Sequence, residues 1–429
     1  MRIAELNVTP IAIADPPLLN SNGLHQPYAL RTIVELVGED GISGWGECAG
    51  GRRMLDAFEG SRQHVVGRSA FELTRLQLAL TGNAPDATQH ETLMGRMNPL
   101  PAARRVFSGV EVAALHLIGK SLGVPVCDLL GGRVRDRVPF SAYLFYKLAG
   151  GGGEVDDARD DEWGEALTPD GVVAQAQAMI TRYGFGSVKL KAGAFPPDEE
   201  IAAMLVLRNA LGPDVPLRID PNAAWTVDTS VAVALALAET LEYLEDPTPG
   251  MAGMGEVHDR LAAEGLRMPL ATNMVVTAFD DIPESLRLRA VDVILGDHHY
   301  WGGLRAVSHL GTLCHTLGLG LSMHSNSHLG ISLLAMTHVA AATPHLTYAC
   351  DTHYPWQHEA DEILVGGKVP IVDGAVVVPS TPGLGIEIDR DALARGRERF
   401  ERGGIAERDD VSEMQRRVDP AWQHIQPRW

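Results

Sequence analysis

Short strand-like runs that end in a polar residue recur along this chain at an almost constant interval. One strand–helix unit of a parallel barrel needs about that many residues, and eight units make a barrel of roughly 250 residues. The interval is 24 to 29 positions between successive terminal residues, which are Lys191, Asp220, Glu245, Asn273, Asp297 and His324. A parallel barrel is therefore predicted, with strands over Phe140–Tyr146, Val188–Lys191, Leu217–Asp220, Tyr243–Glu245, Leu270–Asn273, Val293–Asp297, Leu321–His324 and Leu346–Cys350.

The segments between these runs have helical periodicity. Glu199–Leu211 and Leu304–Leu317 place apolar residues three and four positions apart, as in an amphipathic helix. A doubly wound α/β sheet has the same alternation of strands and helices, and it stays open as the alternative fold.

The two ends of the chain have a different pattern. The N-terminal part combines strand-like runs over Arg2–Ile13 and Arg31–Val37 with a helix over Val110–Leu122, which indicates an α+β unit. Beyond about residue 370 come a short strand, Ala375–Val378, and a charged helical stretch that can fold back onto the N-terminal unit. Because 429 residues exceed one usual hydrophobic core, we predict an N-terminal unit (1–135), a barrel (136–370) and a returning C-terminal segment (371–429).

The charge balance excludes two classes of partner. With 36 Lys and Arg against 55 Asp and Glu, the net charge is −19, whereas nucleic acids and anionic membranes require a cationic surface. The longest strongly apolar stretch, Val231–Ala238, is too short for a membrane span, and Glu5 interrupts any signal peptide. The 4 cysteines are far apart, which is typical of reduced thiols. We expect a cytoplasmic protein.

Three of the terminal polar residues form a candidate metal site. Active sites of parallel barrels lie at the C-terminal ends of the strands. Asp220, Glu245 and Asn273 end three successive strands and offer only oxygen ligands, a set that suits Mg²⁺. The alternative for each of them is a helix N-cap.

Two further pairs are candidate bases. Lys189 and Lys191 lie on one face of their strand, and a lysine whose pKa is lowered by burial beside a cation can act as a base. The alternative is a solvated pair on an edge strand. Asp297 and His324 end neighbouring strands, so the carboxylate can fix the imidazole tautomer and raise its basicity, although a lone histidine is more often structural.

One acidic segment is too polar for a core. The glycines of Gly150–Gly153 precede five acidic residues between positions 154 and 161, which indicates a mobile connection, either a lid or a linker.

These residues together resemble the enolase superfamily, and within it the glucarate dehydratase group. The resemblance spans nearly the whole chain, and its most specific part is Lys-x-Lys followed by Asp, Glu, Asn, Asp and His at barrel spacing. The matching motifs are Leu19–Asn20 with Gly23–His25, Gly46–Glu47 with Gly50–Gly51, Tyr143–Phe145, Lys189–Lys191, Asp220–Asn222, Glu245–Pro247, Ala271–Met274, Met323–His328, Asp351–His353 and Arg408–Asp410.

The resemblance implies a modified (β/α)₇β barrel with an α+β capping domain built from both chain ends. It implies that Asp220, Glu245 and Asn273 bind Mg²⁺, and that Lys191 and His324 are bases on opposite faces of an acid-sugar substrate, with Asp297 orienting His324. Mg²⁺ and Lys189 would stabilise the enediolate formed on deprotonation, and protonated His324 would help the β-hydroxyl to leave as water. The implied substrate contacts are Asn20, His25, Tyr143, Lys189, Asn222, Ser325, Asn326, His353 and Arg408.

This chain departs from the group pattern at two places, and the role of Arg408 and the substrate have more than one interpretation. Arg408 can clamp a second substrate carboxylate, or it can form an ion pair with Asp409 or Asp410. The group's threonine before the first long helix has no clear counterpart around Asn98–Phe107, and His298 stands where the group usually has proline. D-glucarate dehydration is the main hypothesis. The alternatives are a dehydratase or epimerase of another hexarate or an aldonate, and a low-activity partner subunit. We also expect a homo-oligomer.

Overall fold

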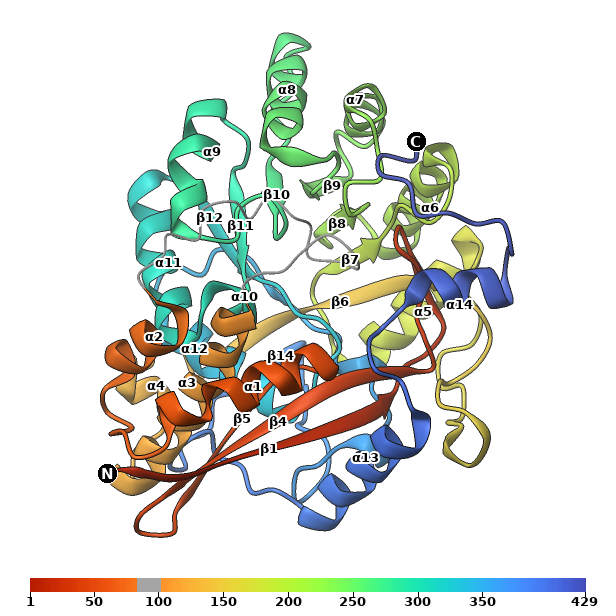
Figure 1. Ribbon diagram of the computed structural model, residues 1–429. Coiled ribbons are helices and arrows are strands. Elements are labelled where there is room, and N and C mark those ends of the chain that lie inside the picture. The colour runs from red at the N-terminus through yellow and green to blue at the C-terminus, as the bar shows by residue number, and fades with distance from the viewer. Residues whose placement is uncertain (83–101) are drawn as a thin grey trace.

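The computed structural model describes residues 1–82 and 102–429. Eight of its strands run parallel in one barrel (Figure 1): the first seven are paired in sequence, and the eighth pairs with the first. Between the seventh and eighth strands the backbone amides of Thr347 and Tyr348 donate to the carbonyl oxygen of Leu321, at 3.0 and 3.1 Å. The barrel strands are β6 (Arg137–Lys147), β7 (Val188–Lys191), β8 (Leu217–Asp220), β9 (Leu241–Glu245), β10 (Leu270–Thr272), β11 (Val293–Gly296), β12 (Gly320–Met323) and β13 (Cys350–Asp351).

One principal helix follows each barrel strand except the last. Most of these helices bury one face against the strands, but every residue of α12 is buried, because this helix also contacts β5 and α4 outside the barrel. The seven are α5 (Pro169–Tyr183), α6 (Pro197–Leu211), α7 (Val227–Ala236), α8 (Gly250–Ala263), α9 (Ile282–Leu288), α11 (Leu304–Leu317) and α12 (Gly330–Ala342). The predicted barrel is thus confirmed, and the doubly wound alternative is wrong.

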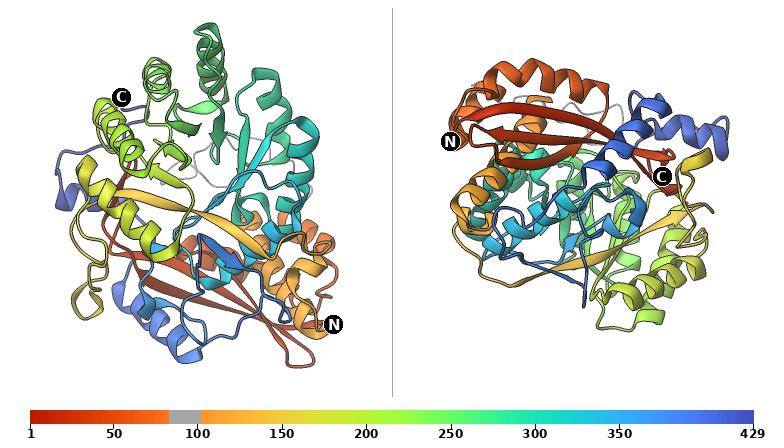
Figure 2. Two further views of the ribbon diagram at one scale, coloured as in Figure 1. Left: turned by 180° about the vertical axis from the view of Figure 1, so that it is seen from behind. Right: turned by 90° about the horizontal axis from the view of Figure 1, so that it is seen from below.

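The N-terminal part forms an antiparallel sheet of three strands, β1 (Ile3–Ala14), β4 (Tyr28–Gly38) and β5 (Ser43–Ala49). Figure 2 shows this sheet as a layer across one end of the barrel. Its helices are α1 (Arg52–Val65), α2 (Leu73–Thr81), α3 (Ala102–Leu122) and α4 (Val126–Leu129). Helix α3 packs so closely on β5 that a Cβ atom on Gly46 would lie 2.2 Å from the carbonyl oxygen of Gly109, so only glycine fits there.

The C-terminal segment contacts both units. It first returns to the barrel, where β14 (Ala375–Val377) pairs with β6. Helix α13 (Arg390–Gly403) then packs against β1, and α14 (Asp410–Arg417) packs against β3 (Gly23–Leu24). Its last residues reach the loop after β8, where the amides of Arg428 and Trp429 donate to the carbonyl oxygen of Ala224. In Figure 1 the C-terminus accordingly lies near α6 and α7.

The structure differs from the expected elements in two places. The last barrel strand was expected over Leu346–Cys350, which is wrong: residues 346–349 bond β12 irregularly, and the strand is Cys350–Asp351. A hairpin of β2 (Leu18–Asn20) and β3 (Gly23–Leu24), which pairs with β6, was not predicted. The remaining short elements are η2 (Val155–Asp157), η3 (Phe279–Asp281), α10 (His298–Trp301), η4 (Tyr354–Trp356) and η5 (Glu359–Asp361).

Hydrogen bonds and ion pairs hold the acidic segment after β6, residues 150–161, at several residues. Lys147 donates to Asp161 at 2.7 Å, and the Asp161 carboxylate also accepts from the amide of Gly150. Arg159 pairs with buried Asp361 at 2.6 Å, and Arg402 of α13 pairs with Asp157. The contacts make this segment a connection tied to the C-terminal part of the chain.

Two smaller expectations concern membranes and thiols. No helix within residues 1–82 and 102–429 combines the length and the apolar character that crossing a bilayer requires. All 4 cysteines are buried and free.

Candidate active site at the C-terminal ends of the barrel strands

The strand ends bring the candidate residues together through the period-two alternation of side chains. Lys191 pairs with Asp220 in the register of β7 and β8, and Lys189 pairs with Arg218 one step deeper. On β6, Tyr143 is the register partner of Lys189. Residues two apart share one face of a strand, so these side chains all face the barrel interior, where each of them is buried.

The lysines and carboxylates form one buried network. Nζ of Lys189 lies 2.6 Å from Glu245 Oε2, 2.7 Å from Asp351 Oδ2 and 3.4 Å from Asp220 Oδ2. Nζ of Lys191 donates to Asp220 and, at 2.6 Å, to Oδ1 of Asn222. The Tyr143 ring lies 4.6 Å from Nζ of Lys189 and adds a cation–π contact. Lys189 and Lys191 are therefore an interior pair, and the edge-strand alternative is wrong.

Neighbouring charges shift the pKa values of the lysines and carboxylates in this network in opposite directions. Burial by itself would lower the pKa of Lys189, but Asp351 and Glu245 raise it well above its ordinary value. Burial likewise opposes ionisation of Asp220, yet Lys191 and Lys189 lower its pKa to about 2. Lys189 is therefore a cation in this network.

Burial and like charge act the other way on two further carboxyls. Burial, followed by the negative charge of Asp220, raises the pKa of Glu245 well above its ordinary value. The same two causes raise the pKa of Asp246 to about 7. This end of the barrel therefore concentrates more negative charge than its own lysines neutralise, which favours a cation.

The donor set fits a hard divalent cation. Among the described residues, Glu245 Oε1 and Asn273 Oδ1 are buried oxygens without a hydrogen-bond partner, and such buried acceptors are normally satisfied. Asp220 Oδ1 accepts from the amide of Asn222 at 2.9 Å. None of the three is an N-cap of the helix that follows, since those caps are Thr226, Pro249 and Ala278, so the N-cap alternative is wrong.

The candidate histidine base has the expected partner. Nδ1 of His324 lies 3.0 Å from Asp297 Oδ2. Burial lowers the pKa of His324, while the bond to Asp297 raises it and the charges of Lys189 and Lys191 lower it further. Lys191 ends β7 and His324 directly follows β12, so the two candidate bases lie at the same end of the barrel.

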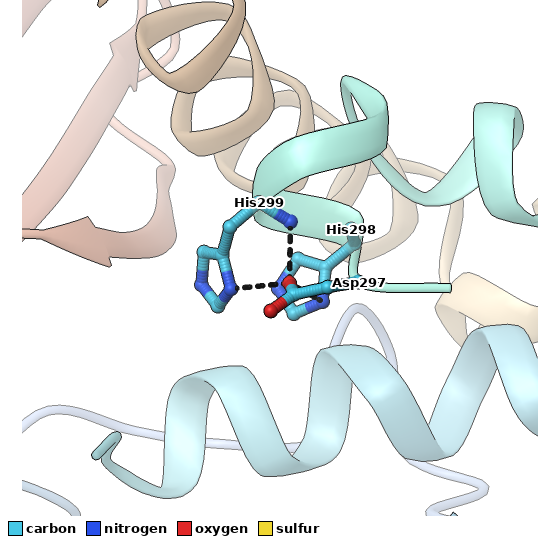
Figure 3. A group of neighbouring side chains, drawn as sticks. All are labelled: Asp297, His298 and His299. Carbon is cyan, nitrogen blue, oxygen red and sulfur yellow. Dashed lines mark hydrogen bonds and ion pairs between the residues drawn. The ribbon is translucent and has the colours of Figure 1, made fainter. Parts of the chain in front are cut away.

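Asp297 also begins a short helix with two more histidines (Figure 3). Its Oδ1 accepts from the backbone amide and from Nδ1 of His299, both at 2.8 Å, whereas Nδ1 of His298 lies 4.0 Å away. Potential ligand atoms of Asp297, His298 and His299 lie within 4.8 Å of one another. Because three N–H groups already occupy this carboxylate, we assign the trio to hydrogen bonding and to no second metal.

The expected substrate contacts are linked through ring and polar contacts. The His353 ring lies 4.8 Å from the Tyr143 ring and 6.3 Å from the His25 ring. The amide of His353 donates to Ser325 Oγ at 3.0 Å, and His25 Nε2 lies 3.1 Å from Asn20 Nδ2. Asn326 lies on the His324 side, where it donates to the hydroxyl of Tyr300, whose ring is 6.1 Å from that of His324.

Arg408 forms the ion pair that was one of its two alternatives. Its Nε donates to Asp410 Oδ1 at 2.7 Å, and its Nη1 donates to Asp15 Oδ2 at 3.1 Å. Asp15 in turn lies 3.1 Å from Nδ1 of His25. The guanidinium is therefore held at the edge of the substrate-contact cluster, through Asp15.

Two residues of the site were missed from the sequence. Asp351 binds Lys189, and the strand-end rule would have found it had the last strand been extended by one residue. His299 binds Asp297 but follows it by only two positions, so no spacing signal marks it.

The two departures from the group pattern fall in different surroundings. Residues 98–101 of the Asn98–Phe107 stretch lie outside the described residues, and the rest of the stretch belongs to α3. His298 is buried beside Asp297, and its carbonyl oxygen accepts from Ser108 of α3 at 2.7 Å. A proline in its place would keep that carbonyl.

Comparisons with known proteins agree with this geometry. A family model described as "Enolase C-terminal domain-like" matches residues 171–392. A probable glucarate dehydratase from Streptomyces coelicolor is 48% identical, with 100% of this chain and 99% of that protein covered. A solved enolase from Mycobacterium smegmatis, complexed with formate and acetate, is 52% identical with a TM-score of 0.92, covering 100% and 98% of the two chains. An enolase from Pseudomonas fluorescens with bound magnesium, potassium and tartrate is 48% identical with a TM-score of 0.92, covering 100% and 99%.

Proposed function

We propose that this chain, which belongs to the enolase superfamily and is one of its enzymes, is a Mg²⁺-dependent dehydratase of an acid sugar. D-glucarate is the substrate, and 5-dehydro-4-deoxy-D-glucarate is the product. One arrangement supports this function above all. Glu245 and Asn273 lie at the ends of neighbouring strands, and each has a buried oxygen without a hydrogen-bond partner. They lie at the same end of the barrel as Lys191 and the His324–Asp297 pair.

Asp220, Glu245 and Asn273 would hold the cation. When bound, Mg²⁺ supplies positive charge beside a substrate carboxylate, which makes the neighbouring C–H bond more acidic. The magnesium and tartrate bound to the Pseudomonas fluorescens enolase support this choice of ion and of ligand class. Lys189, held cationic by Asp351 and Glu245, adds a second positive charge at the same place.

Lys191 and His324 do the proton chemistry. One of them removes the proton from the carbon next to the carboxylate, and the electron pair forms a carbon–carbon double bond as the β C–O bond breaks. Where His324 is the base, it passes the proton that it has taken to the departing hydroxyl, and where Lys191 is the base, His324 starts protonated and supplies that proton. The hydroxyl leaves as water in both cases. The enol that remains takes up the keto form, so the product is the substrate minus one water.

The remaining polar side chains orient the sugar. Asn222, which receives a hydrogen bond from Lys191, and Asn326, which lies beside His324, are placed to bind hydroxyl groups. Arg408 contributes positive charge at the far edge of the cluster through its link to His25. We propose the remaining contacts at Asn20, Tyr143, Ser325 and His353. A cytoplasmic location and a homo-oligomer complete the proposal.

Turnover of a panel of acid sugars tests this function. The purified protein is incubated with Mg²⁺ and hexarates, hexonates or pentonates, and keto-acid formation is measured. Formation of a keto-acid from D-glucarate is expected. Product from galactarate but not from glucarate would change the substrate and keep the mechanism. Epimerisation without water loss, or no turnover of any acid sugar, would overturn the dehydratase proposal.

A further inference from the structure

The carboxylate of Asp297 is shared between two imidazoles. Oδ2 faces Nδ1 of His324 at 3.0 Å, and Oδ1 faces Nδ1 of His299 at 2.8 Å. The backbone amide of His299 donates to the same Oδ1 at 2.8 Å (Figure 3). His299 belongs to α10 and His324 follows β12, so the carboxylate joins two elements.

These contacts fix the tautomer of both rings. A carboxylate only accepts hydrogen bonds, so both Nδ1 atoms carry hydrogen. Nε2 of His299 then accepts from the hydroxyl of Ser332 at 3.1 Å. Nε2 of His324 has no hydrogen-bond partner among the described residues, so its lone pair is free to take a substrate proton.

We propose that His299 is a positioning residue that sets the acid strength of protonated His324 by sharing the Asp297 carboxylate with it. This inference rests on the proposed function, in which protonated His324 gives its proton to the leaving hydroxyl. A hydrogen bond from His299 offsets part of the negative charge on Asp297. The His324 imidazolium is then stabilised less than by an unshared carboxylate, and it releases its proton more readily.

Other titratable and charged groups surround the pair, and a substitution of His299 leaves them unchanged. They lie on α10, β4, β5, α3, β7, the segment before α12 and the segment after β13, and they are His298, Tyr300, Arg31, Glu47, Arg105, Lys189, Lys191, His328 and His353. A substitution confined to His299 leaves all of them in place, so a change in the His324 titration reports the shared carboxylate.

Nitrogen-15 NMR of the imidazoles in the full-length protein with Mg²⁺ tests the proposal. His299→Phe removes the side-chain donor and keeps a ring, so the pKa of His324 should rise by about one unit. His299→Asn keeps a nitrogen donor near the Nδ1 position and should restore most of the original value. His298→Phe is the matched control, because that neighbouring buried imidazole lies 4.0 Å from Asp297 and its loss should leave the His324 titration nearly unchanged.

The tautomer in the unsubstituted protein gives a second test that needs no variant. Hydrogen on Nδ1 of His299 is expected, and hydrogen on Nε2 with bare Nδ1 would overturn the proposal. An unchanged His324 pKa in folded His299→Phe would overturn it as well. These measurements use no substrate, so they are distinct from the turnover assay. In that assay, His299→Phe should lower kcat for water loss with little change in KM or in exchange of the substrate α-proton.

Discussion

Nζ of Lys191 lies 2.6 Å from Oδ1 of Asn222, which ties the proposed base to the loop after β8. Asn222 and Ala223 both have positive φ, 52° and 58°, a conformation that costs on the order of 1 kcal/mol for each non-glycine residue. The loop keeps it because the Ala223 amide donates to the carbonyl oxygen of Asp246 at 2.6 Å and the C-terminal residues bond the same loop. The position of Lys191 thus depends on contacts remote from the substrate.

Replacing Gln426 should disturb this loop. Nε2 of Gln426 donates to the carbonyl oxygen of Asn222, and losing one such bond costs about 0.5–1.5 kcal/mol. Gln426→Ala should therefore lower kcat roughly 2- to 10-fold in steady-state kinetics. Gln423→Ala, three positions earlier and exposed, is the control that should match the unsubstituted enzyme. Equal rates for both variants would mean that the tail does not position the loop.

Each proposed base should be needed for substrates whose α-proton faces it. Lys191→Ala and His324→Ala should each slow dehydration of the corresponding substrate by about 10²- to 10⁴-fold, measured together with exchange of the α-proton in deuterated water. Lys120→Ala removes a lysine of α3 that pairs with Glu387, and it should leave rates unchanged. Full activity in both base variants would refute the two-base scheme.

Mg²⁺ should stabilise the folded enzyme through the carboxylates at the strand ends. At a concentration 100 times its Kd, a ligand specific to the folded state adds about 2.7 kcal/mol, which thermal unfolding detects as a higher Tm. Asp220→Asn and Glu245→Gln should remove most of this shift, and EDTA should reverse it. Asp259→Asn changes an exposed carboxyl paired with Arg289 and should keep the full response. A Tm that does not change when Mg²⁺ is added would count against the proposed metal site.

Glu362 should make stability depend on pH. Burial raises its pKa to about 7, above the ordinary value near 4.5, so the folded state holds a proton that the unfolded state loses first. This stability is complete below about pH 4.5 and is lost as the pH rises to about 7, by roughly 3 kcal/mol. Glu362→Gln should gain about that much relative to the unsubstituted protein over this window in urea unfolding.

The control for that experiment is Glu359→Gln, which changes an exposed carboxyl of the neighbouring η5. Its stability difference from the unsubstituted protein should not vary between these pH values. A Glu362→Gln difference that is equally flat would show that the carboxyl titrates normally in the folded state.

The barrel and the enolase superfamily could be predicted because their signals are local and repeated. Strand ends such as Asp220 and Glu245 follow from spacing, and the shared face of Lys189 and Lys191 follows from alternation. The β13 boundary could not be predicted, since Leu346–Ala349 bonds β12 without a regular ladder. The metal and substrate roles stay predictions, as does the division into units at residues 135 and 370.

Contacts between distant segments could not be predicted from the sequence, for a different reason. Nothing in residues 426–429 marks them as partners of Asn222 and Ala224, because backbone carbonyls accept hydrogen bonds from any sequence. The ion pair of Arg408 with Asp15, 393 positions away along the chain, is likewise decided by tertiary packing. In each case the partner is selected by tertiary packing.

The docking of residues 426–429 on the loop after β8 has a consequence for how the enzyme is made. On the ribosome all eight barrel strands are complete once residue 351 has emerged, but the loop that holds Lys191 gains these bonds more than 70 positions later. A nascent chain can therefore form its barrel before the bonds of residues 426–429 fix the loop that contacts Lys191, the proposed base.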